Sequence, residues 1–397
     1  MLAVLDGQRV CGRTWMGAAV LGLALCACSS QTAANAAGGG AGDTTGVGGS
    51  DSDGTGSGGD STSGDGGAEV GPIIVHFVPG AVVSTVAGSA TAGHADGQGS
   101  AATFDNPVNL ALGADGNLRV ADYNNGMIRL VTPGGAVSTL TAQTHFARPF
   151  GATFDAAGTL LVETDWSSTG QNFTGAGTIW SVATASGSAS VVVGNVGKPR
   201  GLKGLSTGLV AVSDMVEHTV RLLDPTTHAI TNLAGKSGVP GNVDGHGADA
   251  RFNWPYGVAE MADGSLVVAD RANHRLRRVT MSGDVTPFAG DGTPGMIDGP
   301  AATARFDYPQ GVAIDSAGNV YVSDTGNNRI RRIDPTGVVE TVAGDGTRAF
   351  RDGDGDQAEF FGAEGLDVTS DGKTIYVADG NGGGTELFNR VRAITMP

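Results

Sequence analysis

One stretch of this 397-residue chain constrains the fold more than any other, because its pattern can be laid over several other parts of the sequence. Residues 306–344 read FDYPQGVAIDSAGNVYVSDTGNNRIRRIDPTGVVETVAG. Four short runs of alternating apolar residues are separated there by clusters of Asp, Asn, Gly and Pro, which predicts four antiparallel strands. A single sheet of this kind cannot bury both of its faces, so we expect the unit to recur.

The unit recurs five more times. Further copies start at Phe104, Phe146, Lys198, Phe252 and Phe360. The Asp that ends the second strand falls at Asp122, Asp214, Asp270, Asp324 and Asp379, and the second copy has Thr164 there, followed by Asp165. Repeated units of four strands predict a β-propeller, in which radial packing covers both faces of every sheet.

The two ends of the array predict how the ring closes. The sixth copy ends with its third strand at 390–395, whereas residues 80–88 (GAVVSTVAG) match the fourth strand at 336–344 (TGVVETVAG). We therefore predict an all-β, six-bladed propeller of four-stranded antiparallel blades, spanning 73–397, whose last blade is closed by the N-terminal strand. Such closure hides two sheet edges.

The repeated motif also carries a resemblance. The string Pro-x-Gly-Val-Ala, then Asp-x-x-Gly-x-Val-x-Val-Ala/Ser-Asp, then Asn-x-x-Arg-Ile/Leu-Arg resembles the NHL repeat over about residues 80–397. The resemblance implies a six-bladed NHL-type propeller. Members of that family include protein-binding, RNA-binding and lyase proteins, so the fold leaves the function open.

The segment before the propeller has two parts. In 1–27, Arg9 and Arg13 precede an apolar run too short to span a bilayer, which predicts a signal peptide. Its end, Leu-Cys-Ala-Cys28-Ser29, resembles a bacterial lipobox. The resemblance implies a lipid anchor on Cys28 and, from Ser29, the outer membrane of the cell envelope, on its periplasmic side or its surface. An ordinary signal peptide is the alternative. Residues 28–72 are rich in Gly, Ser and Asp and predict a flexible tether.

Charge limits the partners. The formal net charge is −16, with 40 Asp and Glu against 24 Lys and Arg. Such a chain repels phosphate backbones, so we expect no nucleic-acid binding, and membrane contact only through the lipid anchor.

The first strand of each unit supplies the candidate site. The residue after its Pro varies while its neighbours stay constant: Val108, Phe150, Arg200, Tyr256 and Gln310, with Glu364 at the equivalent place and Asn109 replacing the following Gly in the first unit. Innermost strands line a propeller's channel, so these side chains are expected to ring its mouth and to bind a small polar ligand or a peptide. Drift at an exposed rim is the alternative.

Irregular segments are expected on the same face. They are the insertions 165–177 and 380–388 and the connections between units, whose recurring Asp-Gly predicts turns. The alternating Asp352, Asp354 and Asp356 leave calcium as an alternative, but they lack the Gly and the terminal acid of a calcium loop. The Asp after each second strand and the Arg of the third strand repeat around the ring, which indicates a structural role. Those arginines are Arg129, Arg221, Arg277, Arg331 and Arg392.

Catalytic patterns are weak. The seven histidines show no metal-ligand spacing, and Gly-x-Ser-x-Gly and phosphate-loop motifs are absent. We predict a protein- or ligand-binding scaffold with no metal or cofactor, whose partner is an envelope protein, a peptide or a small polar ligand. The alternative is a lactonase- or lyase-type enzyme in which Arg200, Tyr256, Glu364 and Asn109 converge at the channel mouth. A purely structural envelope protein is a third reading.

Overall fold

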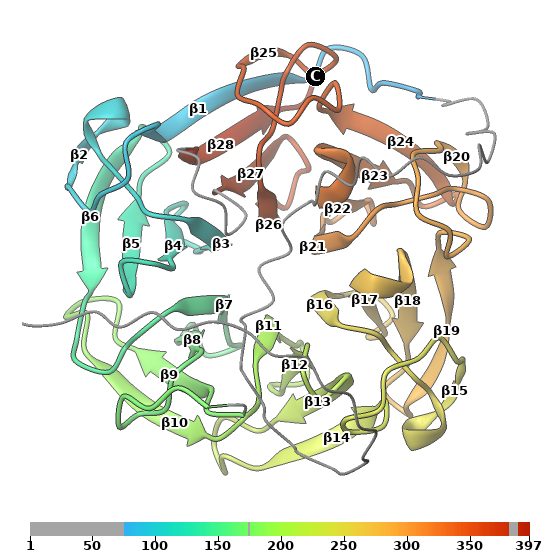
Figure 1. The fold of residues 1–397 in the computed structure, drawn as a ribbon, viewed down its shortest axis with the longest axis horizontal. Helices are drawn as coiled ribbons and strands as arrows, with labels where there is room; N and C mark the ends of the chain where they lie inside the picture. The colour runs from blue at the N-terminus through green and yellow to red at the C-terminus, as the bar shows by residue number, and fades with distance from the viewer. Residues whose placement is uncertain (1–74, 174, 381–387) are drawn as a thin grey trace, which may run out of the picture. The chain divides into compact units, whose positions relative to one another are not determined.

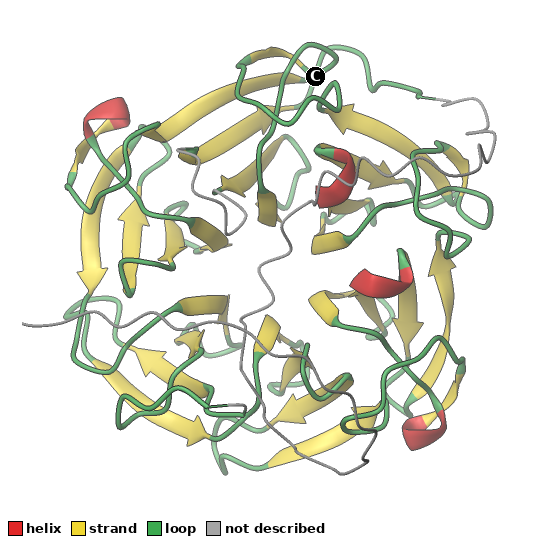
Figure 2. Cartoon of the chain, in the orientation of Figure 1, coloured by secondary structure: helices red, strands yellow, loops and turns green. Residues whose placement is uncertain are grey.

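The computed structural model describes residues 75–173, 175–380 and 388–397 (Figures 1 and 2). The predicted signal peptide, the lipidation at Cys28 and the tether lie outside the described residues, as does most of the predicted insertion at 380–388. The regular secondary structure of the described chain is almost entirely sheet. Its helical elements are four single 3₁₀ turns, at Gly99–Ala101, Gly247–Asp249, Arg271–Asn273 and Thr325–Asn327, and none is long enough to cross a membrane.

Six antiparallel sheets stand around a central channel, with the first strand of each blade innermost (Figure 1). Blade 1 contains β3 (Pro107–Leu112), β4 (Leu118–Asp122), β5 (Met127–Val131) and β6 (Ala136–Thr141). Blade 2 contains β7 (Pro149–Phe154), β8 (Leu160–Thr164), β9 (Thr178–Val182) and β10 (Ala189–Gly194). Blade 3 contains β11 (Pro199–Gly204), β12 (Val210–Asp214), β13 (Thr219–Leu223) and β14 (Ile230–Ala234).

The second half of the ring repeats this order. Blade 4 contains β16 (Pro255–Glu260), β17 (Leu266–Asp270), β18 (Arg275–Val279) and β19 (Asp284–Ala289). Blade 5 contains β21 (Pro309–Ile314), β22 (Val320–Asp324), β23 (Arg329–Ile333) and β24 (Val338–Ala343). Blade 6 contains β26 (Ala363–Val368), β27 (Thr374–Asp379), β28 (Asn389–Thr395) and, from the N-terminal side, β1 (Val82–Ser89). The six-bladed prediction is confirmed.

The predicted closure is also confirmed. Strand β1 pairs antiparallel with β28, from Val82 opposite Thr395 to Ser89 opposite Asn389. The chain just before β1 also reaches blade 5, where Phe77 forms a parallel bridge with Thr341 of β24. The N-terminal segment therefore ties two neighbouring blades together and covers strand edges that would otherwise be open.

The core lies between neighbouring blades. Strands β4, β8, β12, β17 and β22 are buried along their whole length, because each is covered on both faces by adjacent sheets. Between blades 6 and 1, for example, Leu118 and Val120 belong to one cluster with Ala378 and Val391. This burial on both faces is what radial packing of repeated sheets requires.

A buried ionic motif recurs in four blades. In blade 5, Arg331 of β23 donates to Asp324 at 2.6 Å and to Asp298 at 2.9 Å through its Nε, and its guanidinium lies 5.0 Å from the ring centre of Phe306. The same clamp of one Arg between two Asp residues occurs as Asp122–Arg129–Asp96, Asp270–Arg277–Asp244 and Asp379–Arg392–Asp352. The structural role predicted for the repeated Asp and Arg is therefore confirmed.

The clamp corrects the interpretation of the Asp-Gly pairs as simple turns on the mouth face. The Asp is the second partner of the buried Arg, and the following Gly begins a two-residue fifth strand on the outer edge of the blade. These strands are β2 (Gly97–Gln98), β15 (Gly245–His246), β20 (Gly299–Pro300) and β25 (Gly353–Asp354). Each pairs with the start of the fourth strand, so the connection runs down the outside of the blade and away from the mouth.

Blades 2 and 3 depart from this pattern. Both sheets have four strands without an added outer strand. Blade 3 keeps only the pair Arg221–Asp214, at 2.6 Å. Blade 2 replaces the ions altogether: Trp180 stands at the Arg position and donates its indole N–H to Thr164, at the Asp position, at 2.8 Å. The indole packs on Phe146, with ring centres 5.6 Å apart.

Candidate functional site at the channel mouth

The channel mouth is the end of the ring where the first strands begin and the second strands end. In every blade the pairing of these two strands shifts register directly after the first residue of the first strand. The variable residue that follows this first residue therefore lies in a β-bulge, a feature that redirects side chains next to sites. Three repeat positions meet at the mouth: the residue before the Pro, the residue after it, and the residue after the second-strand Asp.

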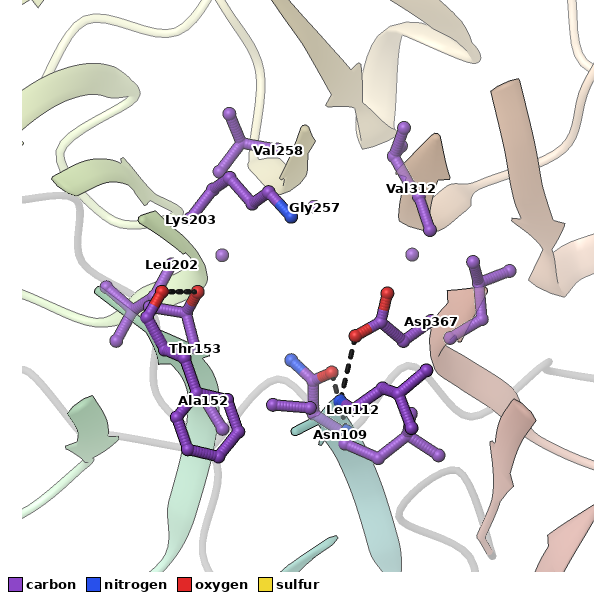
Figure 3. Close-up of a pocket in the computed structure, with 17 residues that line it drawn as sticks. Asn109, Leu112, Ala152, Thr153, Leu202, Lys203, Gly257, Val258, Val312 and Asp367 are labelled. Atoms are coloured by element: carbon purple, nitrogen blue, oxygen red, sulfur yellow. Dashed lines mark hydrogen bonds between the residues drawn. The ribbon is translucent and has the colours of Figure 1, made fainter. Parts of the chain in front are cut away.

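The predicted ring residues are not an exposed rim. Val108, Phe150, Arg200 and Gln310 are buried, and Tyr256 and Glu364 are partly buried. Asn109 lies one residue further along the first strand and lines a cavity inside the channel rather than the mouth (Figure 3). The structure thus places six of the seven predicted site residues at the mouth and the seventh, Asn109, beneath them.

Arg200 is held between blades 2 and 3. It donates to both oxygens of Asp165, at 2.6 and 3.3 Å, and its guanidinium lies 4.4 Å from the ring centre of Phe150. The Tyr123 hydroxyl donates to the same carboxylate at 2.6 Å. Burial pushes the pKa of Asp165 upward, but the ion pair with Arg200 outweighs it and lowers that pKa. Asp165 and Arg200 are therefore both charged at neutral pH, and they form a fixed wall of the mouth.

Glu163 was missed by the sequence analysis. It is fully buried, its Oε2 lies 3.8 Å from Arg200 Nη1, and neither of its carboxyl oxygens has a hydrogen-bond partner among the described residues. Burial, followed by the charge of Asp165, raises its pKa well above the usual range, so we take the carboxyl as neutral. A comparison of one repeat position would have found it, because the other units carry Ala121, Ser213, Ala269, Ser323 and Ala378 there.

An aromatic sector lies on blades 4 and 5. The guanidinium of Arg271 is 5.5, 5.1 and 4.7 Å from the ring centres of Trp254, Tyr256 and Tyr308. Its Nε is buried without a hydrogen-bond partner, and within the described part of the chain no acidic side chain forms an ion pair with it. The sequence analysis missed Arg271 because only the residues after the Pro were compared. The equivalent residues are Tyr123, Asp165, Met215, Thr325 and Gly380.

The backbone under this sector is strained. Trp254 and Tyr308 have φ of 55° and 48°, in the left-handed region that bulky residues rarely adopt. Each backbone N–H donates to a histidine ring, from Trp254 to His218 and from Tyr308 to His274, both at 3.2 Å. Burial lowers the pKa of His218, which keeps its ring neutral and able to accept. Asn106 and Arg148 have the same conformation at this repeat position, with φ of 57° and 55°, so the strain belongs to the repeated frame. Both aromatic side chains remain 39% exposed and present their ring faces to solvent.

Glu364 completes the mouth from blade 6. Burial raises its pKa to about 7, against the opposing charges of Arg271 and Arg200. Gln310, from blade 5, is only 5% exposed and has a side-chain oxygen without a partner. The mouth therefore combines a cation without an ionic partner, exposed aromatic faces, a carboxyl that titrates near neutral pH and an unused amide oxygen.

Beneath the mouth, the first strands enclose a cavity of about 130 Å³ (Figure 3). A ring of glycines lets these strands approach each other: a Cβ on Gly257 would lie 2.4 Å from the carbonyl oxygen of Gln310. The polar side chains that line the cavity are Asn109, Thr153, Lys203 and Asp367.

No group of three or more His, Cys, Asp or Glu side chains within the described residues is arranged to hold a metal ion. Asp352, which the calcium alternative requires, accepts from Arg392 at 2.7 Å. The absence of a metal or cofactor stays a prediction.

Comparison with known families identifies the repeat. A model of the NHL repeat matches residues 306–333. The chain carries an NHL repeat at these residues. A chloroplastic protein of Arabidopsis thaliana, SUPPRESSOR OF QUENCHING 1, is 33% identical to this chain over 133 aligned residues, and the alignment covers 31% of this chain and only 12% of that protein. The activity of such a longer protein therefore cannot be assigned to the propeller directly.

Solved structures share the fold at low identity. An auxiliary nutrient binding protein from Bacteroides thetaiotaomicron superposes with a TM-score of 0.62 at 18% identity, covering 79% of this chain and 76% of that one. A gluconolactonase from Xanthomonas campestris superposes with a TM-score of 0.54 at 14% identity, covering 81% and 91%. At such identities these similarities show a common propeller fold and nothing about the ligand.

Proposed function

We propose that the propeller is a ligand-binding module that captures a small polar molecule with an anionic group at the channel mouth. The observation that carries the proposal is Arg271, a guanidinium surrounded by three aromatic rings and without an ion-pair partner among the described residues. A partly desolvated cation gains most when a ligand supplies the missing negative charge. The other arginine of the mouth, Arg200, is already paired with Asp165.

The surroundings of Arg271 favour an acidic sugar. The exposed faces of Trp254 and Tyr308 are suited to stacking against a pyranose ring. Glu364 and Gln310 supply hydrogen-bonding groups for hydroxyls, and Arg271 would bind the carboxylate in a bidentate manner. The nutrient-binding description of a Bacteroides protein of the same fold is in line with this class of ligand. In its broader form, the proposal also includes a ligand that is a peptide or an envelope protein, bound through an acidic side chain.

The cellular setting belongs to the proposal as well. We place the propeller outside the cytoplasm, on a lipid anchor at Cys28 in the outer membrane, with residues 28–72 as a tether. Metabolic labelling with a palmitate analogue tests this: the wild-type chain should be labelled and Cys28→Ser should not. Labelling that is equal in both chains, or absent from both, would overturn the anchor.

Calorimetric titration of the full chain with D-glucuronate, and with D-glucose as the neutral control, tests the ligand class. Glucuronate should bind at least about tenfold more tightly than glucose, a difference of about 1.4 kcal/mol. Arg271→Ala should remove that preference. The matched control is Arg278→Ala, because Arg278 is 41% exposed and pairs with Asp263 away from the mouth. Equal affinity for the two sugars, or a normal preference in Arg271→Ala, would refute the proposal.

A second candidate rests on Glu364. A carboxyl whose pKa is about 7 suits general acid–base catalysis at neutral pH, so a lactonase- or lyase-type activity at the same mouth is the alternative. Hydrolysis of glucono-δ-lactone, measured for the wild type and for Glu364→Gln, distinguishes the two. A wild-type rate above background that is lost in Glu364→Gln would favour the enzyme.

A further inference from the structure

The cavity beneath the mouth carries two charges that the ligand at the mouth would not reach. At one position of the first strand the six blades carry Ala111, Thr153, Lys203, Ala259, Ala313 and Asp367. Lys203 belongs to blade 3 and Asp367 to blade 6. Blades three apart in a ring of six stand opposite each other, so the ammonium and the carboxylate approach the same cavity from opposite sides (Figure 3).

Neither charge is neutralised by the protein. Asp367 accepts two backbone hydrogen bonds, from Leu112 at 2.9 Å and from Val368 at 2.9 Å, but none of the described cations pairs with it. Lys203 has no hydrogen bond or ion pair among the described residues, and its side chain extends toward Gly257 along the cavity wall (Figure 3). Both side chains are partly buried, where an unpaired charge costs free energy.

The comparison with Thr153 shows that charge is not needed for the local structure. Thr153 occupies the same repeat position in blade 2, and its hydroxyl accepts the N–H of Gly204 in the neighbouring blade at 3.0 Å. Asp367 forms the equivalent bond to Leu112, so a neutral hydroxyl satisfies the same backbone group that the carboxylate satisfies. Alanine suffices at three of the other positions. A neutral residue at the positions of Lys203 and Asp367 would therefore support the sheet structure equally well, so their charges are not needed for the fold.

We propose that this cavity binds a small zwitterion of the amino-acid class, whose carboxylate pairs with Lys203 and whose ammonium group pairs with Asp367. One water needs roughly 10–15 Å³ of such space, so a cavity of about 130 Å³ has room for a molecule of the size of alanine. The lining also includes the aliphatic side chains of Leu202, Val258 and Leu366, and Asn109 offers an amide beside the ligand. This site is independent of the proposed function at the mouth.

The test is calorimetric titration of the full chain with L-alanine, compared with propionate and ethylamine, which each carry one of the two charges. L-alanine should bind at least about tenfold more tightly than either fragment. Lys203→Met and Asp367→Asn should each weaken L-alanine binding at least about tenfold. Lys236→Met, on an exposed loop, is the control and should leave binding unchanged. Thermal unfolding of each variant confirms that it is folded.

Two outcomes would overturn the proposal: absence of L-alanine binding at millimolar concentration, or equal binding by the wild type and both neutral variants. The double variant Lys203→Asp/Asp367→Lys exchanges the charges across the channel and should recover part of the affinity lost by either single charge reversal, since a zwitterion can turn around. Failure of recovery in a folded double variant counts against it. Arg271→Ala should leave L-alanine binding intact, which separates this site from the mouth.

Discussion

Blades 2 and 5 have the same order of four paired strands but use their charged residues in opposite ways. In blade 5 the charges serve the frame: Arg331 is sealed between Asp324 and Asp298, and all three side chains are fully buried. In blade 2 the frame position holds the neutral pair Thr164 and Trp180. The acidic residues of that blade, the neutral Glu163 and the charged Asp165, stand instead beside Arg200 at the mouth. In this repeat protein, the candidate functional residues therefore lie where one blade differs in sequence from the structural pattern that the other blades share.

The largest effect is expected from breaking the frame of blade 5. Arg331→Met leaves Asp324 and Asp298 without their shared cation in a fully buried site. Removing one partner of a buried ion pair costs about 3–5 kcal/mol, so urea unfolding should show a loss of that size. Arg332→Ala, in a partly exposed pair with Glu340, is the matched control and should cost less than about 1 kcal/mol. Similar losses in the two variants would show that the clamp does not hold the blade.

Neutralising Glu364 at the mouth should stabilise the protein at high pH, whereas Arg331→Met should destabilise it. Because the folded-state pKa of Glu364 is raised to about 7, its contribution to stability is fully present below the unfolded pKa of about 4.5 and is lost as the pH rises through 7. Glu364→Gln should therefore match the wild type near pH 4 and be more stable at pH 8, by at most about 3 kcal/mol. Thermal unfolding across this range measures the difference. A variant that is less stable than the wild type at pH 8 would contradict the raised pKa.

The neutral pair of blade 2 should be weaker than the clamp of blade 5. Trp180→Phe keeps most of the apolar packing on Phe146 but removes the indole N–H that Thr164 accepts. Loss of one buried neutral hydrogen bond costs about 1–2 kcal/mol, which chemical denaturation resolves. A loss as large as that of Arg331→Met would mean that the two blades rely equally on this position and that the comparison is wrong.

The smallest effect is expected at Glu163. If its buried carboxyl is neutral at pH 7, Glu163→Gln exchanges one neutral group for another of the same shape and should change the free energy of unfolding by less than about 0.5 kcal/mol. Chemical denaturation at pH 7 checks this. A stabilisation of more than about 1 kcal/mol would show instead that the carboxyl is charged in the folded protein.

The sequence was sufficient for the fold because each unit repeats the same short-range signals. Apolar alternation, Asp and Gly at strand ends, and the orphan fourth strand at 80–88 all agree with one another, and agreement between local and global signals predicts a unique fold. The same repetition predicted that the residues following the Pro of each first strand form a ring at the channel mouth.

What escaped prediction depends on contacts across blades. Nothing in the local sequence shows that Asp298 turns inward to Arg331 instead of capping its own turn, since both roles favour Asp before Gly. Arg271 stands three residues before His274, whose ring holds the backbone of Tyr308 in the next blade, and that contact follows only from closing the ring. That Lys203 and Asp367 stand on opposite sides of the channel likewise follows only from the number of blades.

The most direct test of the account is a crystal structure of the full chain soaked with D-glucuronate. The account predicts the carboxylate within hydrogen-bond distance of the Arg271 guanidinium, with the sugar ring over Trp254 or Tyr308 and a hydroxyl against Glu364 or Gln310. Glucuronate bound elsewhere, or a mouth that stays empty at saturating ligand while Arg271 keeps its place among the three rings, would contradict it.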